Sequence, residues 1–210
     1  MVHSQTRDPK KLTRRGSVTR SRIIQAAQKL LSEHGVAGTS LDEIMAIAGV
    51  SKSQLYHYFE DKEAIVAAAI QLQVEQVLSA QNPALRLIDS RRALQKWRDV
   101  VVALSKAQGT KGGCPIGSLA NELSNKSEQS RKLVEYSFEK WRVEIENGLQ
   151  RMKARGELSS KAKPDELATA ILSAAQGGLL LAKTSRSVRP VEIALDMALA
   201  YVDTFANVRS

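Results

Sequence analysis

Five polar residues close together in the sequence carry side-chain groups that proteins use to recognise DNA. They are Lys52, Ser53, Gln54, Tyr56 and His57. A glutamine amide matches the hydrogen-bonding edge of adenine in the major groove, and a lysine ammonium bonds guanine or a phosphate oxygen. The polar ends of the tyrosine and histidine side chains suit phosphate oxygens. This set of residue types favours contact with a nucleic acid.

Two short helices are expected to present these side chains, over residues 41–48 and 52–58. A serine stands directly before each, with a glutamate or glutamine three residues later: Ser40 with Glu43, and Ser51 with Gln54. Each pair matches a capping box, in which both side chains satisfy backbone amides at the helix start. Gly49 lies between the helices, where a sharp turn needs a positive φ or a close backbone approach. The pattern predicts a helix-turn-helix over residues 40–59, whose second helix offers its first side chains to base edges.

The apolar positions predict which sides of the two helices are buried. The residues expected to face inward are Leu41, Ile44, Ile47, Ala48, Leu55 and Phe59. Two capped helices that merely pack in a bundle are the alternative, but packing gives no reason for Tyr56 and His57 on the outer side. For Tyr58, an inward position that serves packing stays open.

Helical periodicity continues along nearly the whole chain. Aromatic residues make up 4% of it, and no strand-like alternation persists. The other expected helices cover residues 19–34, 61–80, 89–107, 115–124, 128–155, 164–184 and 190–207. The sequence therefore predicts an all-α fold of about nine helices. We expect residues 19–66 to form a helix-turn-helix domain and residues 67–210 to form a larger helical domain.

Positive charge is concentrated at the N-terminus. Residues 1–22 hold seven Lys and Arg against one Asp, so six of the nine net positive charges lie there. A basic block of this kind often contacts a polyanion, either a nucleic acid or an acidic membrane surface, and a solubilising tail can have the same composition. We expect residues 1–18 to form a flexible basic arm.

The remaining composition argues against several other classes of protein. Cys114 is the only cysteine and the three histidines are scattered, so neither a disulfide nor a metal site is expected. Without a phosphate-binding glycine loop, a nucleophile elbow or paired catalytic carboxylates, we expect neither enzymatic activity nor a cofactor. No apolar run approaches the roughly 18 residues that cross a bilayer, and no secretory signal opens the chain. A cytoplasmic protein is expected.

Residues 44–65, IMAIAGVSKSQLYHYFEDKEAI, resemble the signature of the tetracycline-repressor (TetR) family. The close match spans residues 19–66, and the remainder resembles the family in helix count and order. The resemblance implies a sequence-specific transcriptional regulator that binds a pseudo-palindromic operator as a homodimer. It further implies a repressor that a small-molecule effector releases from DNA, with an activator as the alternative. A non-specific architectural DNA binder is a rival class, but it would need no large effector domain.

By position, eight residues match the DNA contacts of the family. They are Ser40, Ser51, Lys52, Ser53, Gln54, Tyr56, His57 and Lys62. Ser53 is a departure, because the family often has glycine there, and the target sequence therefore does not carry over. Some members also place a basic arm in the minor groove, a role that the charge count supports for Arg14, Arg15 and Arg20.

The resemblance places an effector pocket and a dimer face in the larger domain. The candidate pocket residues are Trp97, Val101, Cys114, Leu119, Tyr136, Trp141 and Gln176. Apolar stripes of this kind are more often ordinary core than the wall of a pocket. The dimer face is expected on the helices at 164–184 and 190–207, where Gly177 and Gly178 permit close approach of a neighbour. Packing within one chain explains the same stripes.

Cys114 has two interpretations. It stands just before an expected helix, whose N-terminal dipole lowers a thiol pKa, and Lys106 and Lys111 are near in sequence. The run 112–123 resembles a segment in a TetR subgroup, some of whose members sense electrophiles or oxidants through a cysteine. A buried core residue is the other interpretation, because free cysteines are commonly buried. Both stay open.

Overall fold

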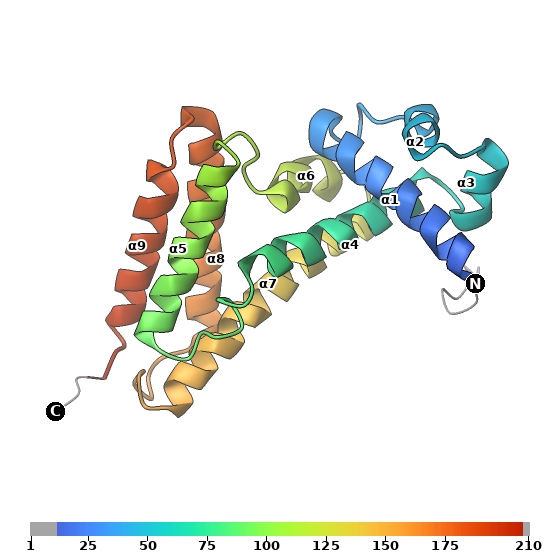
Figure 1. The fold of residues 1–210 in the computed structure, drawn as a ribbon. Helices are drawn as coiled ribbons and strands as arrows, with labels where there is room; N and C mark the ends of the chain where they lie inside the picture. The colour runs from blue at the N-terminus through green and yellow to red at the C-terminus, as the bar shows by residue number, and fades with distance from the viewer. Residues whose placement is uncertain (1–11, 208–210) are drawn as a thin grey trace. The chain divides into compact units, whose positions relative to one another are not determined.

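The computed structural model describes residues 12–207. Within this range the chain forms nine helices, and its only strand-like pairing is a single antiparallel bridge between Leu158 and Ala206 (Figure 1). The prediction of an all-α fold is confirmed. The chain divides into two compact units, of which the first ends at Leu72 and the second begins at Gln73. This division falls inside one helix, whereas the sequence analysis placed it after residue 66.

The first unit is built from three helices and the beginning of a fourth. These are α1 (Arg14–His34), α2 (Leu41–Ala48), α3 (Lys52–Tyr58) and the first part of α4 (Lys62–Gln81). The residues buried among them include Ile23, Ala27, Leu30, Leu31, Ile44, Ala48, Leu55, Phe59 and Ile65. This small core holds the helix-turn-helix to α1 and α4.

Helix α1 begins at Arg14 rather than at residue 19. The Thr13 hydroxyl caps it by accepting a hydrogen bond from the Gly16 amide at 3.1 Å. The prediction of a flexible arm is therefore wrong for residues 14–18, which are helical, while residues 1–11 of that arm lie outside the described residues.

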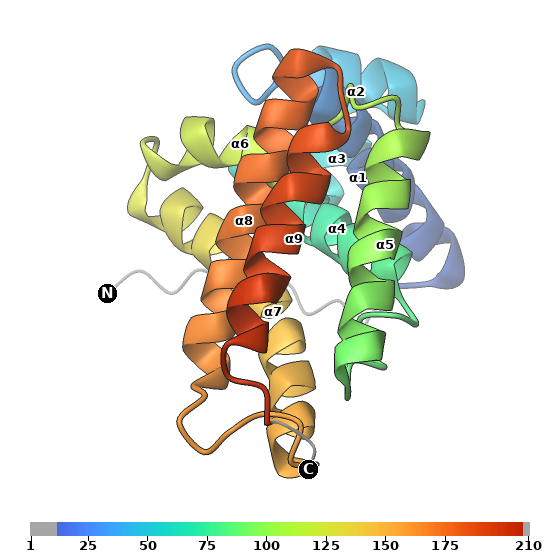
Figure 2. The same ribbon diagram turned by 90° about the vertical axis from the view of Figure 1, so that its left-hand side faces the viewer.

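The second unit continues α4 and adds five helices. They are α5 (Arg91–Ala107), α6 (Pro115–Ser124), α7 (Glu128–Ala154), α8 (Pro164–Ser185) and α9 (Arg189–Asp203). Helices α5, α8 and α9 run side by side, while α7 packs against α8 and α6 against α7 (Figures 1 and 2). Trp97 and Trp141 are among the largest fully buried side chains. The predicted helix ranges agree with these elements within a few residues.

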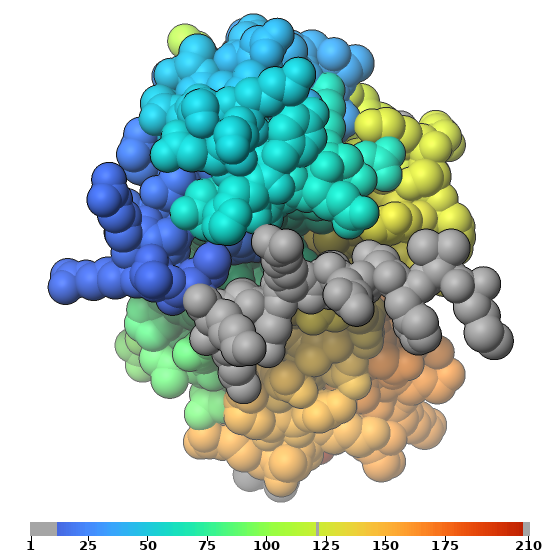
Figure 3. Space-filling view, turned by 90° about the vertical axis from the view of Figure 1, so that its right-hand side faces the viewer, coloured from blue at the N-terminus to red at the C-terminus, as the bar shows by residue number. Residues whose placement is uncertain are grey.

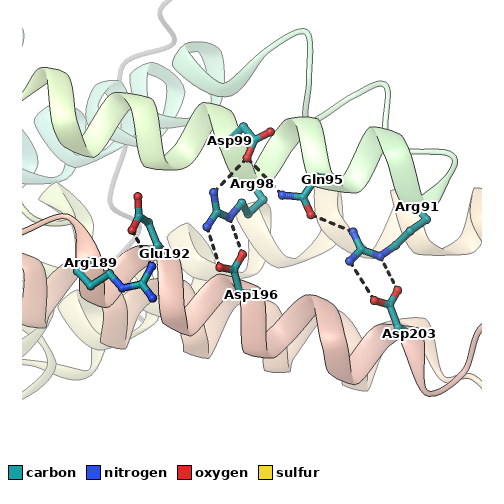
Figure 4. Close-up of polar contacts among 8 residues, drawn as sticks. All are labelled: Arg91, Gln95, Arg98, Asp99, Arg189, Glu192, Asp196 and Asp203. Atoms are coloured by element: carbon teal, nitrogen blue, oxygen red, sulfur yellow. Dashed lines mark hydrogen bonds and ion pairs between the residues drawn. The ribbon is translucent and has the colours of Figure 1, made fainter.

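Ion pairs join α5 to α9 along one side of the second unit (Figure 4). Arg98 of α5 lies 2.8 Å from Asp196 of α9, and it also pairs with Asp99 at 3.1 Å. Arg91 pairs with Asp203, the last residue of α9. Burial opposes the charge of Arg98, but hydrogen bonds to Asp196 and Asp99 outweigh this effect and raise its pKa. These pairs fix the register of α5 on α9.

Helix α8 is long and apolar enough to cross a membrane by length and composition alone, and 44% of its most apolar window is buried in the protein. From the sequence, this segment was expected to form part of the dimer face, and no apolar run long enough to cross a bilayer was expected. Its buried side chains include Leu167, Ala168, Ile171 and Ala175. Because α8 packs against both α7 and α9, these apolar residues belong to the core of the second unit.

Candidate DNA-binding surface and effector cavity

Both predicted capping boxes are present at the helix-turn-helix. The Ser40 hydroxyl accepts a hydrogen bond from the Glu43 amide at 3.2 Å, and the Glu43 carboxylate accepts one from the Ser40 amide at 2.9 Å. Ser51 and Gln54 make the same two bonds at 3.2 and 2.9 Å. Hydrogen bonds from the Ser40 hydroxyl and amide lower the pKa of Glu43 below its usual value. The caps determine where α2 and α3 begin.

The turn between α2 and α3 depends on Gly49 and on a residue from α1. Gly49 has φ 59° and ψ 46°, the left-handed conformation that glycine adopts readily. Arg22 donates hydrogen bonds to the Ala48 carbonyl and, at 3.2 Å, to the Gly49 carbonyl. A Cβ on Gly49 would lie 2.8 Å from the Arg22 guanidinium. The sequence analysis missed this role of Arg22, because no local pattern links residue 22 to residues 48 and 49.

The outer face of α3 carries the residues singled out for DNA contact. Ser51, Lys52, Ser53, Gln54, Tyr56 and His57 are all exposed, and they contribute to the cyan and teal surface in Figure 3. Leu55 and Phe59, at 0% and 4% exposure, hold the other side of the helix in the core. Tyr58 is half-buried, and its ring lies 4.9 Å from that of His57 in an edge contact. The structure therefore brings the six polar residues together on one accessible surface.

The prediction that Ile47 faces inward is wrong, because its side chain is 49% exposed. At 3.6 residues per turn, Leu41, Ile44 and Ala48 fall within one narrow stripe of α2, and Ile47 lies at the edge of that stripe. A helix of eight residues buries little more than such a stripe. Ile47 thus adds apolar surface beside the turn.

Lys62 is anchored within the first unit. Its ammonium donates a hydrogen bond to the Val36 carbonyl at 3.0 Å, and the residue is half-buried. An ammonium has three donors, so this bond leaves two for a phosphate. The sequence analysis treated Lys62 only as a DNA contact, but the structure shows that it also ties the start of α4 to the turn after α1.

The three arginines assigned to the basic arm all lie on α1. Arg14 and Arg15 are exposed in its first turn. Arg20 is half-buried, and its guanidinium lies 5.1 Å from the centre of the Phe59 ring. The flexible-arm prediction for Arg14 and Arg15 is corrected accordingly, because the helix holds their backbone. Arg20 packs over the end of the helix-turn-helix.

The second unit contains a cavity of about 230 Å³. It is partly open to solvent and is lined by residues of α4, α5, α7 and α8 and by the segment that leads into α6. The lining residues are Gln73, Gln76, Val77, Ala80, Gln81, Val101, Leu104, Ser105, Gln108, Gly113, Cys114, Pro115, Trp141 and Leu179. The wall is thus largely apolar, with amide side chains contributed mainly by α4.

Three of the predicted pocket residues line this cavity: Val101, Cys114 and Trp141. Trp97 lies behind the wall, fully buried, and its indole N–H bonds the Gln81 amide oxygen at 2.8 Å. Leu119 is buried at 7% exposure but is not part of the wall. The glutamines of α4 were missed, because nothing local distinguishes them from solvent-facing glutamines.

Tyr136 does not belong to the cavity, and its prediction is wrong. Its side chain is 54% exposed, and the Lys140 ammonium lies 5.1 Å from the centre of its ring. The buried stripe of α7 runs instead through Val134, Ser137 and Trp141. Tyr136 is adjacent to this stripe in sequence, but the helix rotates it by about 100° per residue toward solvent.

Cys114 is both the N-cap of α6 and part of the cavity wall. Its sulfur accepts a hydrogen bond from the Gly117 amide at 3.4 Å, and Gln176 of α8 lies beside the thiol. Burial raises the pKa of Cys114, which outweighs the opposing hydrogen bonds from Gly117 and Gln176. Of the two interpretations of Cys114, the buried residue is the one that the structure favours, because the loss of hydration is a larger effect on the pKa than the helix terminus.

Across residues 12–207, no group of three or more His, Cys, Asp or Glu side chains is placed to hold a metal ion. Two capped short helices on a small core, followed by a helical unit with an internal cavity, define an all-α helix-turn-helix protein of the DNA-binding class. Comparison with known proteins agrees with this class.

Residues 90–198 match the family of tetracyclin repressor-like C-terminal domains, and residues 23–69 match the tetR family of bacterial regulatory proteins. The chain therefore belongs to the TetR family, and it is a DNA-binding transcriptional regulator. An uncharacterized HTH-type transcriptional regulator from the lacX 3′ region of Lactococcus lactis is 29% identical over 184 residues, which cover 85% of this chain and 90% of that protein.

Two further relatives extend the comparison. The HTH-type transcriptional repressor NemR of Escherichia coli is 27% identical over 185 residues, covering 84% of this chain and 90% of that protein. The crystal structure of a TetR transcriptional regulator from Chloroflexus aurantiacus superimposes with a TM-score of 0.75 at 27% identity, covering 94% of this chain and all of that one. The similarity thus includes both units.

Proposed function

We propose that this protein is a repressor that binds a pseudo-palindromic operator as a homodimer and leaves it when a small molecule fills the cavity of the second unit. The observation that carries the proposal is the face of α3, where six polar residues are exposed on a helix that is capped at Ser51 and held by Leu55. That relatives such as NemR are named repressors supports the direction of regulation.

In this proposal the residues of the helix-turn-helix divide into base readers and phosphate contacts. Gln54 reads adenine in the major groove, and Lys52 bonds guanine or phosphate. The phosphate backbone is contacted by the remaining six residues: Ser40, Ser51, Ser53, Tyr56, His57 and Lys62. Arg14, Arg15 and Arg20 add positive charge along α1, which strengthens binding to any DNA sequence.

The proposed dimer forms through residues 164–184 and 190–207. The exposed apolar side chains of α8 and α9 are Leu180, Leu181, Ile193, Met197 and Tyr201, at 47–65% exposure. Gly178 does not serve a partner, because a Cβ there would lie 3.0–3.1 Å from Val191, Ala194 and Pro190 of the same chain. Gly177 faces open space, so a second chain can approach α8 there.

Selection from a pool of random-sequence DNA duplexes tests the proposal directly. We expect the full-length protein to enrich one pseudo-palindromic sequence, because two copies of α3 read two half-sites related by a two-fold axis. Analytical ultracentrifugation of the complex should show two chains per duplex. If the bound duplexes share no common sequence, the result would instead support a non-specific, architectural DNA binder.

Regulation through a reactive thiol is the alternative function. The position of Cys114 in the cavity wall favours it, whereas the raised pKa leaves the thiol protonated and weakly nucleophilic. Release of the selected operator by hydrogen peroxide in the wild type, but not in Cys114→Ser, would support a thiol sensor. If hydrogen peroxide affects operator binding equally in the two proteins, binding of a ligand in the cavity remains the proposed signal for release.

The remaining inferences follow from this role. A regulator that binds operator DNA acts in the cytoplasm, and the relatives reported above are transcriptional regulators rather than enzymes. Repression or activation depends on where the operator lies relative to the promoter. A reporter gene behind the selected operator, with and without the protein, distinguishes the two.

A further inference from the structure

Trp141 occupies an unusual position for a buried polar group. It is 2% exposed and forms part of the cavity wall. Among the residues that the structure describes, its indole Nε1–H has no hydrogen-bond partner. A buried indole N–H usually finds an acceptor, because an unpaired donor loses its bond to water without replacement. Trp141 thus carries an unused donor in a side chain that lines the cavity.

Trp97 provides an internal comparison. It lies on α5 in the same unit and is fully buried, but its Nε1–H bonds the Gln81 amide oxygen at 2.8 Å. The Gln81 amide nitrogen in turn donates to the Val77 carbonyl at 3.0 Å. The described chain thus supplies a hydrogen-bond partner for Trp97, which lies behind the cavity wall, but none for Trp141, which is part of the wall.

The cavity wall carries no formal charge. None of its described lining residues is Asp, Glu, Lys, Arg or His. Burial also raises the pKa of Cys114, so its thiol stays neutral near pH 7. A charged ligand would lose its hydration in this cavity without gaining an opposite charge, which is strongly unfavourable.

The volume of the cavity and the dipoles at its wall further restrict which ligands it can bind. A volume of about 230 Å³ is below the usual range for drug-sized ligands and therefore favours a small molecule. Cys114 and Pro115 bring the N-terminus of α6 to the wall, and the positive end of a helix dipole attracts electron-rich atoms. Both the indole donor and the helix favour an acceptor.

We propose that the effector is a small, uncharged and mainly apolar molecule whose oxygen or other acceptor atom takes the Trp141 Nε1–H. This inference rests on the proposed function, because it specifies the ligand of the same cavity. It makes Trp141 a specificity-determining residue, and it places the apolar part of the ligand against Val77, Val101 and Leu179.

Isothermal titration calorimetry on the full-length protein without DNA tests this inference. Four probes are compared: acetophenone and cyclohexanone as neutral acceptors, ethylbenzene as an apolar analogue without an acceptor, and benzoate as an anion. We expect the two ketones to bind more tightly than ethylbenzene and benzoate not to bind. Trp141→Phe keeps a buried aromatic ring but removes the donor, so it should weaken ketone binding about three- to tenfold and leave ethylbenzene unchanged.

Trp97→Phe is the matched control, because its N–H already has a protein partner and its loss should not change the ratio of ketone to ethylbenzene affinity. Equal ketone affinity in Trp141→Phe and wild type, tighter binding of benzoate than of the ketones, or no binding of either ketone would each overturn the inference. If the ketones bind but do not release the selected operator, the ligand site stands and the proposed repressor mechanism fails.

Discussion

Gln54 has two roles that compete for one side chain. Its amide oxygen accepts the Ser51 amide in the cap of α3, and the same oxygen would accept the amino group of adenine in a bidentate contact. An oxygen with two lone pairs can serve both partners only if the side chain keeps its capped orientation. The cap thus pre-orients Gln54, and the geometry of base recognition depends on Ser51.

We predict that Gln54→Ala weakens binding to the selected operator by about 10- to 100-fold, because a bidentate base contact contributes roughly 1–3 kcal/mol of discrimination. Binding to random-sequence DNA at the same salt concentration should change much less. Ser51→Ala removes the hydroxyl that caps α3 but keeps the backbone amide that orients Gln54, so it should weaken binding to both DNAs by a similar factor. Gln129→Ala, an exposed glutamine at the start of α7, is the control.

Cys114 makes stability depend on pH in a defined direction. Its pKa is raised in the folded state, so above about pH 8.5 the unfolded chain loses the thiol proton before the folded chain does. The folded protein then binds more protons than the unfolded one, and the free energy of unfolding falls as pH rises.

Denaturant unfolding at pH 7 and pH 9.5 checks this prediction. Wild type should lose more stability between the two values than Cys114→Ser, because serine does not titrate in this range. A thiol with a lowered pKa would produce the opposite difference. Slow alkylation of the native protein by iodoacetamide at pH 7 should accompany the result, since the buried thiol is protonated.

At the scale of elements, the α2–α3 turn is held from outside the helix-turn-helix itself. Arg22 of α1 bonds the carbonyls at the end of α2, where the last carbonyls of a helix lack partners. Its positive charge also complements the C-terminal end of the α2 dipole. The angle between α2 and α3, and with it the position of Gln54, depends on α1.

Arg22→Met should therefore weaken binding to operator and random DNA and lower the stability of the first unit by up to about 1 kcal/mol. Lys29→Met removes the same charge from an exposed position of α1 and is the control. If both variants lose equal affinity with an equal change in salt dependence, Arg22 acts through charge alone. Arg22→Lys keeps the charge, so it should recover all of the affinity if charge alone matters and only part of it if the carbonyl contacts matter.

Gly148 lets α7 approach the segment that leads into α5. A Cβ on Gly148 would lie 2.7 Å from two side-chain carbons of Ile88, a residue that is itself fully buried. Arg151, one turn later, donates to the Ile88 carbonyl at 2.9 Å and holds the same segment in place. The close packing therefore cannot relax easily.

We predict that Gly148→Ala destabilises the protein by roughly 1–3 kcal/mol in chemical denaturation, although alanine favours helix formation. Asn147→Ala, at the exposed neighbouring position of α7, should be neutral or slightly stabilising. A stabilising Gly148→Ala would show that helix propensity outweighs packing here.

At the scale of the whole molecule, the exposed apolar side chains of α8 and α9 determine the expected assembly. Several large apolar side chains exposed on two neighbouring helices are typical of an interface between chains. A dimer with two-fold symmetry also doubles the number of reading helices on DNA. The affinity for a palindrome then depends on a surface that never contacts DNA.

Met197→Glu is expected to convert the dimer to monomers and to reduce operator affinity by more than tenfold, because it buries a charge without a partner at the interface. Leu87→Glu is a matched control, because Leu87 and Met197 are 63% and 65% exposed and only Met197 lies on α9. Size-exclusion chromatography with light scattering measures the assembly. If the Met197→Glu variant remains dimeric, the interface must lie elsewhere on the chain.

The helix-turn-helix could be predicted from the sequence because its determinants are local. Each capping box spans only four residues, Gly49 lies two residues before Ser51, and the structure contains both caps and the turn. The start of α1 was predicted too late, because Thr13 and Gly16 are a weaker signal than the basic residues around them. The helix count could be predicted from apolar periodicity alone.

The cavity required the tertiary structure. Its wall joins Gln73 and Gln81 of α4 to Cys114 and Trp141, residues that only the packing of the second unit brings together. The positions of the two side chains around the axis of α7 decided that Trp141 is buried and that Tyr136 is exposed. Burial, which no stretch of sequence reports by itself, reversed the expected pKa shift of Cys114. The sequence by itself thus determined the DNA-reading element, and long-range packing decided which side chains meet a ligand.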